Sequence, residues 1–460
     1  MQSETHTVIV GGSLAGLLMG RVLANHCDRV TIIERDAYPD QPTPRKGVPH
    51  SRFPHTLMLK GQQILEALFP GLKAELISAG AIELDSLNDL AFLTPAGWAA
   101  RSSSNLMLLS CSRDLLDWCI RRRVAQLPNV QFLTQTTVAG LLTDADHTKI
   151  TGVLLDQNEA MNELYADLIV DASGKASHTP NWLRTLGYEA PSEIEVNAFV
   201  GYVARIYQHP LEWSVDWQMM FMPAAPPQQH RGGAIFPIEG DRWIISLAGG
   251  DRDYPPTDEA GFIAFARTLP SSTIADAIER STPLTPIYAY YGNENRLRQY
   301  DRLSHLPAHL IVVGHAACSL NPTYGQAMTV AALEATIVDR FFQQYPVEAL
   351  DTQTPHLQKQ LAKAHQEAWS AATGMDYRYE SVPGKSISAV TQFVNWYWEQ
   401  LMTVVVEDAT ACRTFLEVLH LLKPSIALFH PSILIQVLVH LFKQYGQLLR
   451  VHSESKLSAH

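Results

Sequence analysis

The sequence predicts an α/β protein with a discontinuous Rossmann-like cofactor domain, an interleaved β-sheet domain and a helical C-terminal region. Two strand–turn–helix patterns, at residues 7–23 and 310–335, carry this prediction. Between them, strand-like runs rich in aromatic side chains occupy residues 181–294. Because the two strand–turn–helix units lie far apart in the chain, the cofactor domain has to be assembled from separate segments.

The domain boundaries follow from these segments. We expect the cofactor domain in residues 1–75, 105–180 and 295–345. The sheet domain, which would bind the substrate, is expected in residues 76–104 and 181–294. A chain of 460 residues is long enough for more than one structural unit around a large core.

The C-terminal region, residues 346–460, is expected to be mainly helical. Apolar residues recur there at helical spacing, as at Phe415, Leu416, Leu419 and Leu422. The sequence shows no internal repeat that would indicate a solenoid.

The composition excludes several classes of protein. Hydrophobic residues make up 46% and charged residues 18%, which is the balance of a folded globular chain. The net charge of −11, with scattered Lys and Arg, would oppose binding to a phosphate backbone, so nucleic acid is not an expected partner. The five cysteines have neither zinc-site spacing nor a disulfide pattern, so we expect no metal and a reducing cytoplasm.

No secretion signal and no transmembrane segment are expected. The N-terminus lacks a basic region before an apolar run, which favours a cytoplasmic location. The longest apolar segment, residues 426–442, is interrupted by His430, Pro431, Gln436 and His440, and is too broken to span a bilayer. It has two interpretations, a buried core helix or a helix in peripheral contact with a membrane surface.

The first strand–turn–helix unit has the chemistry of a dinucleotide site. The β-branched run Thr7–Val10 leads into Gly11-Gly-Ser-Leu-Ala-Gly16 and then into a helix. Amides at such a helix start face a pyrophosphate, and glycines let the backbone approach it closely. The serine stands where the full fingerprint has its middle glycine. The cofactor-binding candidates in this unit are Gly11, Gly12, Ser13, Ala15 and Gly16.

A second β-run, residues 29–33, ends at Glu34, about 20 residues after the first glycine, where an acidic side chain can bind the ribose hydroxyls of a dinucleotide. We add Glu34 and the adjacent Arg35 to the cofactor-binding candidates. The alternative interpretation is a Gly-rich turn in an ordinary α/β fold with Glu34 as a surface carboxylate.

Two further strand ends complete the pattern. The run Ala166–Val170 enters Asp171-Ala-Ser-Gly174, a sequence that is also common in simple turns. The run Leu310–Val313 enters Gly314-His315, and the segment after it leads into a helix rich in Ala, Val and Leu.

Taken in order, these clusters resemble the motifs of the FAD-dependent monooxygenases of the p-hydroxybenzoate hydroxylase-like superfamily. The resemblance covers nearly the whole chain and is greatest with the bacterial polyether epoxidase-type branch, through segments such as Pro44–His50, Phe236–Trp243 and Ala368–Asp376. The family motif reads Gly-Asp where this chain has Gly314-His315, and it prefers glycine at position 327, where this chain has alanine.

The resemblance implies FAD as the cofactor, and NAD(P)H or a separate flavin reductase as the electron source. It implies that reduced FAD reacts with O₂ to form a C4a-hydroperoxide. One oxygen atom would then pass, by epoxidation or hydroxylation, to a hydrophobic polyketide, terpenoid or aromatic metabolite. Carried over by position, the remaining cofactor-binding candidates are Arg113, Asp171, Gly174, Gly314, His315, Pro322, Gly325, Gln326, Ala327 and Met328.

Few acid–base residues are expected, because the cofactor carries out the chemistry. His50 and His55 are candidates for facing the flavin, although a histidine in a connecting segment is often only hydrogen-bonded. Arg113 has a second interpretation: it could be a solvent-exposed arginine that follows a serine capping the helix. The aromatic candidates for the substrate pocket, which have the alternative of being core residues, are Phe221, Phe236 and Tyr291.

Two other functions stay open. A flavin halogenase would carry Trp-x-Trp-x-Ile-Pro, whereas Trp396-Tyr-Trp398 continues as Glu-Gln-Leu. A flavoprotein-fold cyclase, isomerase or binding protein without net redox chemistry would fit the departures at His315 and Ala327.

Overall fold

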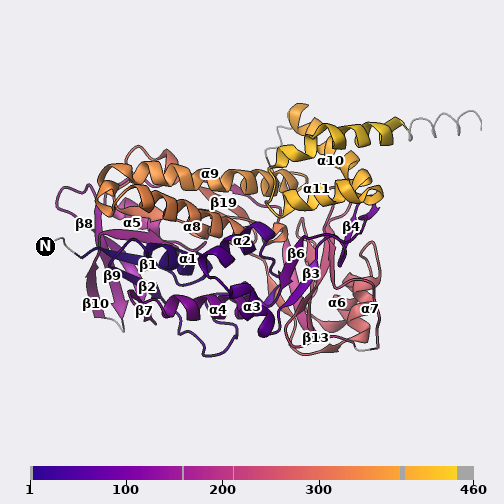
Figure 1. The fold of residues 1–460 in the computed structure, drawn as a ribbon, viewed down its shortest axis with the longest axis horizontal. Helices are drawn as coiled ribbons and strands as arrows, with labels where there is room; N and C mark the ends of the chain where they lie inside the picture. Colours follow the sequence, from indigo (N-terminus) through magenta and orange to yellow (C-terminus); the bar gives the residue numbers. More distant parts are fainter. Residues whose placement is uncertain (1–3, 158–159, 211, 384–388, 443–460) are drawn as a thin grey trace, which may run out of the picture.

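Two large sheets lie side by side along the long axis of the molecule (Figure 1). The structure is a computed structural model and describes residues 4–157, 160–210, 212–383 and 389–442. The α/β class expected from the sequence is confirmed: a parallel sheet carries helices on one face, and a mainly antiparallel sheet lies beside it.

The first sheet is entirely parallel, in the order β20-β11-β1-β2-β7. Its interior strands are continuous apolar or β-branched runs because both of their faces are covered. All five strands point the same way, so their carboxyl ends meet at one edge. The strands are β1 (His6–Val10), β2 (Arg29–Glu34), β7 (Val130–Thr134), β11 (Leu168–Asp171) and β20 (Leu310–Val312).

Helices cover one face of this sheet and a small antiparallel sheet covers the other. The helices of the first face share one core cluster, in which Leu17, Ile120 and Val338 are fully buried. They are α1 (Leu14–Leu23), α2 (Leu59–Leu68), α3 (Leu72–Ser78), α4 (Arg113–Ala125) and α8 (Ala327–Gln344). The opposite face packs against β8 (Thr137–Thr143), β9 (Ile150–Gln157), β10 (Ala160–Tyr165) and α5 (Thr179–Thr185).

The second sheet has eight strands in the order β17-β13-β16-β15-β14-β4-β5, with β18 also paired to β13. It joins residues 90–98 to residues 201–290, two stretches that are far apart in the chain. The strands are β4 (Leu90–Thr94), β5 (Gly97–Trp98), β13 (Gly201–Gln208), β14 (Met219–Met222), β15 (Arg231–Ile238), β16 (Arg242–Gly249), β17 (Thr282–Pro283) and β18 (Tyr288–Tyr290). Its outer face packs against α6 (Glu259–Ala266) and α7 (Thr273–Arg280).

Two small sheets complete the architecture. One pairs β3 (Ile82–Asp85) with β6 (Met107–Ser110). The other has the order β12-β19-β21, from β12 (Glu193–Val196), β19 (Asn295–Arg298) and β21 (Cys318–Ser319). This second ribbon carries the chain back from the large antiparallel sheet to the end of β20.

The C-terminal helices do not form one unit. Helix α9 (Leu350–Asp376) packs with α8, and its Leu350, Leu357 and Leu361 belong to the core of the parallel sheet. Helices α10 (Ala389–Glu407) and α11 (Ala409–Leu419) instead pack with Phe92 and Met219 of the antiparallel sheet. The expected boundary at residue 346 therefore does not mark a break in packing.

The last described helix, residues 431–442, has a buried apolar side and an exposed apolar side. Ile433 and Val437 are buried against the α10–α11 core, whereas Ile435 and Leu438 are more than half exposed. No helix in the part of the chain that the structure describes is long and apolar enough to cross a membrane.

The packing of α9 makes a testable prediction. Leu361 is fully buried in the core shared with α1 and α8. Leu361→Ala is therefore expected to lower the free energy of unfolding by about 2–5 kcal/mol, because it leaves a cavity. Urea unfolding would measure the change. The exposed Lys359→Ala on the same helix is the control, with an expected change within about 0.5 kcal/mol. Equal effects would contradict the shared core.

Candidate functional site

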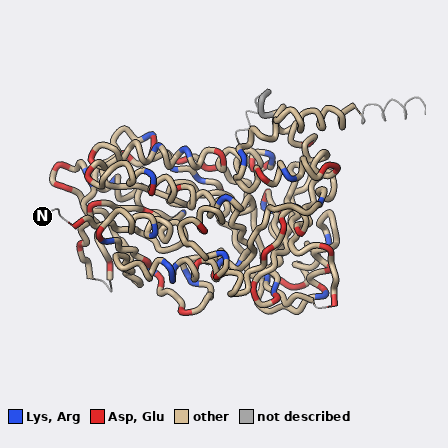
Figure 2. The backbone as a smooth tube through the Cα atoms, in the orientation of Figure 1, with Lys and Arg blue, Asp and Glu red and all other residues tan. Residues whose placement is uncertain are grey.

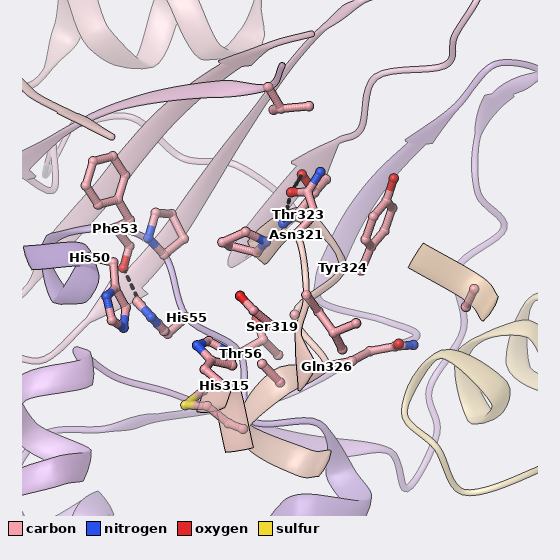
Figure 3. A pocket seen from close by; sticks show the side chains of 18 of the residues that line it. His50, Phe53, His55, Thr56, His315, Ser319, Asn321, Thr323, Tyr324 and Gln326 are labelled. Carbon is pink, nitrogen blue, oxygen red and sulfur yellow. Dashed lines mark hydrogen bonds between the residues drawn. The ribbon is translucent and has the colours of Figure 1, made fainter. Parts of the chain in front are cut away.

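A cavity of about 1260 Å³ lies between the two sheets. Its walls come from the carboxyl ends of β1, β2, β11 and β20, from the inner face of the antiparallel sheet, and from α9, α10 and α11. Figure 3 shows part of this wall, where histidines gather on one side and Asn321, Thr323 and Tyr324 lie across from them. Most of the residues proposed from the sequence line it.

The turn between β1 and α1 has the geometry of a pyrophosphate cradle. Gly11 has a φ of +102°, and a Cβ there would lie 2.5 Å from the carbonyl oxygen of Ala172. Gly11, Ser13 and Ala15 line the cavity. Gly12 and Gly16 lie outside its lining, where an added Cβ would collide with Tyr38 and with the Gly11 carbonyl oxygen. These two glycines therefore permit packing beneath the cradle.

Glu34 lines the cavity at the end of β2, but it is not a free surface carboxylate. It is 6% exposed, accepts the backbone N–H of Gly12 at 3.1 Å and pairs with Arg45 at 2.8 Å. The guanidinium of Arg45 thus brings a positive charge to the cavity wall beside Glu34. Arg35 also lines the cavity, as proposed. Arg45 was not among the residues selected from the sequence, because its pairing with Glu34 depends on how the loop after β2 folds back.

Arg113 is the buried first residue of α4, next to the cradle. Its Nε donates to Asp117 at 2.8 Å and its Nη2 donates to Ser13 Oγ at 3.4 Å. Ser112 does cap α4, by accepting from the N–H of Leu115. The arginine behind this cap lines the cavity at 5% exposure, so the alternative of a solvated arginine is wrong.

Asp171 shapes the site without lining it. Its buried carboxylate accepts from the backbone N–H of Ser173 at 2.9 Å and from Thr179 Oγ1 at 2.7 Å, and also from Ser177. These bonds hold the turn that presents Ala172 and Gly174 to the cavity. Asp171 was expected to bind the cofactor. Its side chain instead supports the turn and does not line the cavity.

The turn after β20 is held from behind by another buried carboxylate. Glu334 of α8 is fully buried and accepts the N–H of Gly314 at 2.9 and 3.0 Å. His365 of α9 pairs with the same carboxylate at 2.7 Å. Together they fix Gly314 and present His315 to the cavity.

Three histidines meet at this part of the wall. His50 and His55 have ring centroids 5.5 Å apart, and both line the cavity together with His315 (Figure 3). Burial, followed by the charge of Arg113, lowers the pKa of His55 to about 3 and that of His315 to about 4. Burial and the neighbouring His55 also lower the pKa of His50 well below its usual value. All three imidazoles are therefore neutral near pH 7.

The segment before α8 supplies backbone donors. Gly325 has a φ of +65°, which places the start of α8 directly after the turn. The proposed residues Pro322, Gly325, Gln326, Ala327 and Met328 all line the cavity. The unpaired amides at the start of this 18-residue helix would stabilise negative charge on a bound cofactor.

Of the three proposed substrate residues, Phe221 and Phe236 line the cavity and Tyr291 does not. Tyr291 is 49% exposed and packs on Tyr254, with ring centroids 4.9 Å apart. Tyr290, the last residue of β18, lines the cavity instead. The choice of Tyr291 is corrected to Tyr290, because adjacent residues point to opposite sides of an extended chain.

An apolar arm of the cavity, which the sequence did not indicate, extends toward the C-terminal helices. It runs between the antiparallel sheet and α10–α11, and its residues belong to one hydrophobic cluster. Apart from Phe221, these residues were not selected from the sequence, because they reach the cavity only through tertiary packing. The main side chains of this arm are Phe92, Phe221, Tyr397, Trp398, Leu401, Met402, Phe415 and Phe429.

The residues present fit FAD. The glycine cradle at the start of α1 would take the pyrophosphate, with Arg45 and Arg113 as nearby cations. Glu34 would bind the adenosine ribose, and the amides at the start of α8 would face the flavin. Among the described residues, no group of three or more His, Cys, Asp or Glu side chains has the arrangement of a metal site.

The lowered pKa of His315 predicts an acid-sensitive fold. Because the pKa is about 4 in the folded state and 6.5 as the usual value, the unfolded chain binds more protons between these values, and stability falls as the pH drops below 6.5. At pH 5 the loss from His315 is about 2 kcal/mol.

Urea unfolding of wild type and His315→Gln at pH 5 to 8 would measure this contribution. The two proteins should differ by a constant amount from pH 7 to pH 8. The wild type should then lose about 2 kcal/mol more than the variant by pH 5. Parallel curves over the whole range would refute the assignment.

The comparisons with known proteins agree with this geometry. The family model described as "FAD binding domain" matches residues 4–338. A curated relative, Protein Rv3254 of Mycobacterium tuberculosis, is 32% identical over 344 residues, which are 72% of each chain.

Solved structures with the same fold include p-nitrophenol 4-monooxygenase PnpA from Pseudomonas putida DLL-E4. It is 17% identical, with a TM-score of 0.63 over 92% of this chain and 100% of that one. The flavin-dependent brominase Bmp2 is 15% identical, with a TM-score of 0.63 over 89% and 94% of the two chains. At these identities the structures establish the fold alone. The family match, which spans most of the chain, establishes more: the chain belongs to the FAD-binding domain family.

Proposed function

We propose that the protein is an FAD-dependent monooxygenase that inserts one oxygen atom from O₂ into a hydrophobic small molecule, by epoxidation or hydroxylation. The observation that carries this proposal is the continuity of the cavity. One cavity runs from the pyrophosphate cradle at α1, past the start of α8, into the apolar arm between the antiparallel sheet and α10–α11. A substrate in that arm would lie beside the cofactor.

The lining of the arm favours an apolar substrate. Phe92 stacks on Phe221 and on Phe415, with ring centroids 5.9 and 5.7 Å apart. Trp398 also packs on Phe415. Aromatic walls of this kind bind a flat or branched hydrocarbon skeleton through apolar contact. A polyketide, terpenoid or aromatic secondary metabolite has that chemistry, and the polyether epoxidase-type branch is our preferred placement within the family.

The chain's own residues would exclude water and orient the substrate, while bound FAD supplies the redox chemistry. The apolar arm keeps bulk water from the reacting centre. The neutral imidazoles of His50, His55 and His315 add no charge to the cavity at pH 7. Because neutral His55 donates its Nδ1–H to the Phe53 carbonyl at 2.9 Å, its Nε2 is left as an acceptor. Electrons would come from NAD(P)H binding transiently, or from a separate flavin reductase.

Turnover tests this proposal. The FAD-loaded protein would be supplied with NADPH or NADH, or with reduced flavin from a reductase, while O₂ uptake and hydrogen peroxide are recorded. Farnesol and 2-naphthol are suitable alkene and aromatic probes. We expect a fitting probe to raise O₂ uptake at least tenfold, to lower the peroxide yield and to gain one oxygen atom from ¹⁸O₂.

Met402→Trp, which fills the arm, should abolish that stimulation while leaving the flavin absorbance unchanged. Two results would support the other functions. Halogenated product formed only with bromide or chloride would identify a halogenase, and conversion of a probe without O₂ uptake would identify non-redox chemistry. Either result would reject the monooxygenase.

We further propose that the exposed face of the helix at residues 431–442 contacts a membrane surface. Its exposed side chains include Ile435, Leu438, Val439 and Phe442, and residues 424–442 contain no Asp, Glu, Lys or Arg. In Figure 2 the backbone of this helix is tan, the colour of residues other than Lys, Arg, Asp and Glu. Val394 of α10 both lines the cavity and is 43% exposed, so the apolar arm reaches the surface on α10.

Flotation with neutral phosphatidylcholine vesicles tests this contact. Since the face has no cation and the protein carries a net charge of −11, binding should rest on apolar burial and be insensitive to salt. Ile435→Glu with Leu438→Glu should abolish flotation. Met161→Glu with Tyr165→Glu, at exposed positions on β10, should not. Flotation that is absent in the wild type, or lost equally in both variants, would refute the contact.

A further inference from the structure

Asp376, the last residue of α9, is a fully buried carboxylate that the sequence patterns did not select. Its recorded partners are three neutral donors. Tyr324 Oη and Asn295 Nδ2 each donate to it at 2.6 Å, and Asn321 Nδ2 lies 3.2 and 3.3 Å from its two oxygens. Among the described residues no Lys, Arg or His forms an ion pair with it. A carboxylate buried with neutral partners alone is energetically costly, so a specific role is expected.

Its partners belong to the turn that faces the cofactor. Asn321 and Tyr324 lie in the segment before Gly325, and both line the cavity (Figure 3). The backbone N–H of Asn321 also donates to Asn295 Oδ1 at 2.7 Å, which ties the turn to β19. Asp376 therefore joins α9 and β19 to the turn at residues 321–325.

The same turn is fixed from the antiparallel sheet. Tyr202 of β13 donates to Asn321 Oδ1 at 2.8 Å and also contacts Thr323. Thr323 donates its hydroxyl to Asn321 Oδ1 at 2.9 Å. Because Oδ1 of Asn321 is occupied by these donors, the amide is held in the orientation that directs Nδ2 toward Asp376. The network fixes both ends of the Asn321 side chain.

We propose that Asp376 is the positioning residue that holds the turn at residues 321–325, and with it the first amides of α8, in the conformation that binds FAD. The proposal rests on the FAD site and not on oxygen transfer, so it stands even if the protein proves not to be a monooxygenase. Only an ionised carboxylate accepts from all three donors at once. An asparagine at this position turns one acceptor into a donor. That donor faces either the amide of Asn295 or the Tyr324 hydroxyl, so at least one of the three bonds is lost or reversed.

The geometry also gives the site a pH dependence. Burial raises the pKa of Asp376 to about 6. The hydrogen bonds from Tyr324, Asn321 and Asn295 act in the opposite direction, because they favour the charged form, but burial has the larger effect. The titratable groups that face it are the phenols of Tyr202, Tyr324 and Tyr379, whose pKa values are raised by burial, so all three are uncharged at neutral pH. When Asp376 is protonated, its O–H needs a hydrogen-bond acceptor. The Tyr324 hydroxyl can accept this bond only if it stops donating to Asp376. The turn should therefore loosen as the pH falls through 6.

FAD binding to Asp376→Asn tests the proposal. The apoprotein would be titrated with FAD at pH 5 to 8, with quenching of flavin fluorescence as the readout. We expect Asp376→Asn to weaken FAD binding at least tenfold at pH 8. The wild type should lose affinity severalfold between pH 7 and pH 5, and this loss should be absent or much smaller in the variant, which cannot titrate. A role in general stability alone would not remove the pH dependence.

Two further variants keep the test decisive. Asp251→Asn is the matched control, because Asp251 accepts the N–H groups of Glu380 and Ser381 just after α9 and does not reach the turn. It should bind FAD like the wild type. Tyr324→Phe removes one donor and keeps the charge, so it should weaken binding by less than Asp376→Asn does. This variant decides the question if Asp376→Asn does not fold. Three results would overturn the proposal: wild-type affinity with an unchanged pH profile in Asp376→Asn, wild-type affinity in Tyr324→Phe, or an equal loss of affinity in Asp251→Asn.

Discussion

The parallel pairing of β1, β2, β11 and β20 is the constraint on which the rest of the site depends. Parallel strands share one direction, so segments from residues 11, 34, 172 and 314 all leave the sheet at the same edge. Backbone amides at this edge have no partners within the sheet, and the helix that starts there adds its own. A dinucleotide is bound at this edge because the free donors of several segments converge there.

The cavity combines two environments that belong to different sheets. The cofactor half is polar, with Arg45, Arg113 and Glu34 in its wall. The arm under α10 and α11 is apolar and aromatic. Hydrophobic packing shapes the arm, while charge and backbone amides shape the cofactor half. The junction of the two is where a hydrophobic molecule would meet the cofactor, with three neutral histidines at the boundary.

Buried carboxylates hold the loops of the site in place without touching the cavity themselves. Asp171 holds the turn after β11, Glu334 holds Gly314, and Asp376 holds the turn before α8. Each carboxylate accepts more than one hydrogen bond. Its negative charge strengthens these bonds relative to bonds accepted by a neutral backbone carbonyl. The burial of these charges is offset by the hydrogen bonds that they receive. The loops of the site therefore depend on α8 and α9 as well as on the sheet.

The sequence by itself determined the local parts of this protein. Strand–turn–helix units, the glycine cradle, Glu34 and the segment from Pro322 to Met328 are encoded by neighbouring residues, and they could be predicted because turn geometry and helix starts depend on short-range spacing. Only the tertiary structure decided that Tyr290 and not Tyr291 faces the cavity, that Arg45 pairs with Glu34, and that α10 and α11 wall the apolar arm. It also decided that Asp376 reaches Asn295, Asn321 and Tyr324. These contacts join residues that lie on different loops, helices or strands, or depend on which side of an extended chain faces inward. The packing of whole sheets and helices sets both, and no short motif records them.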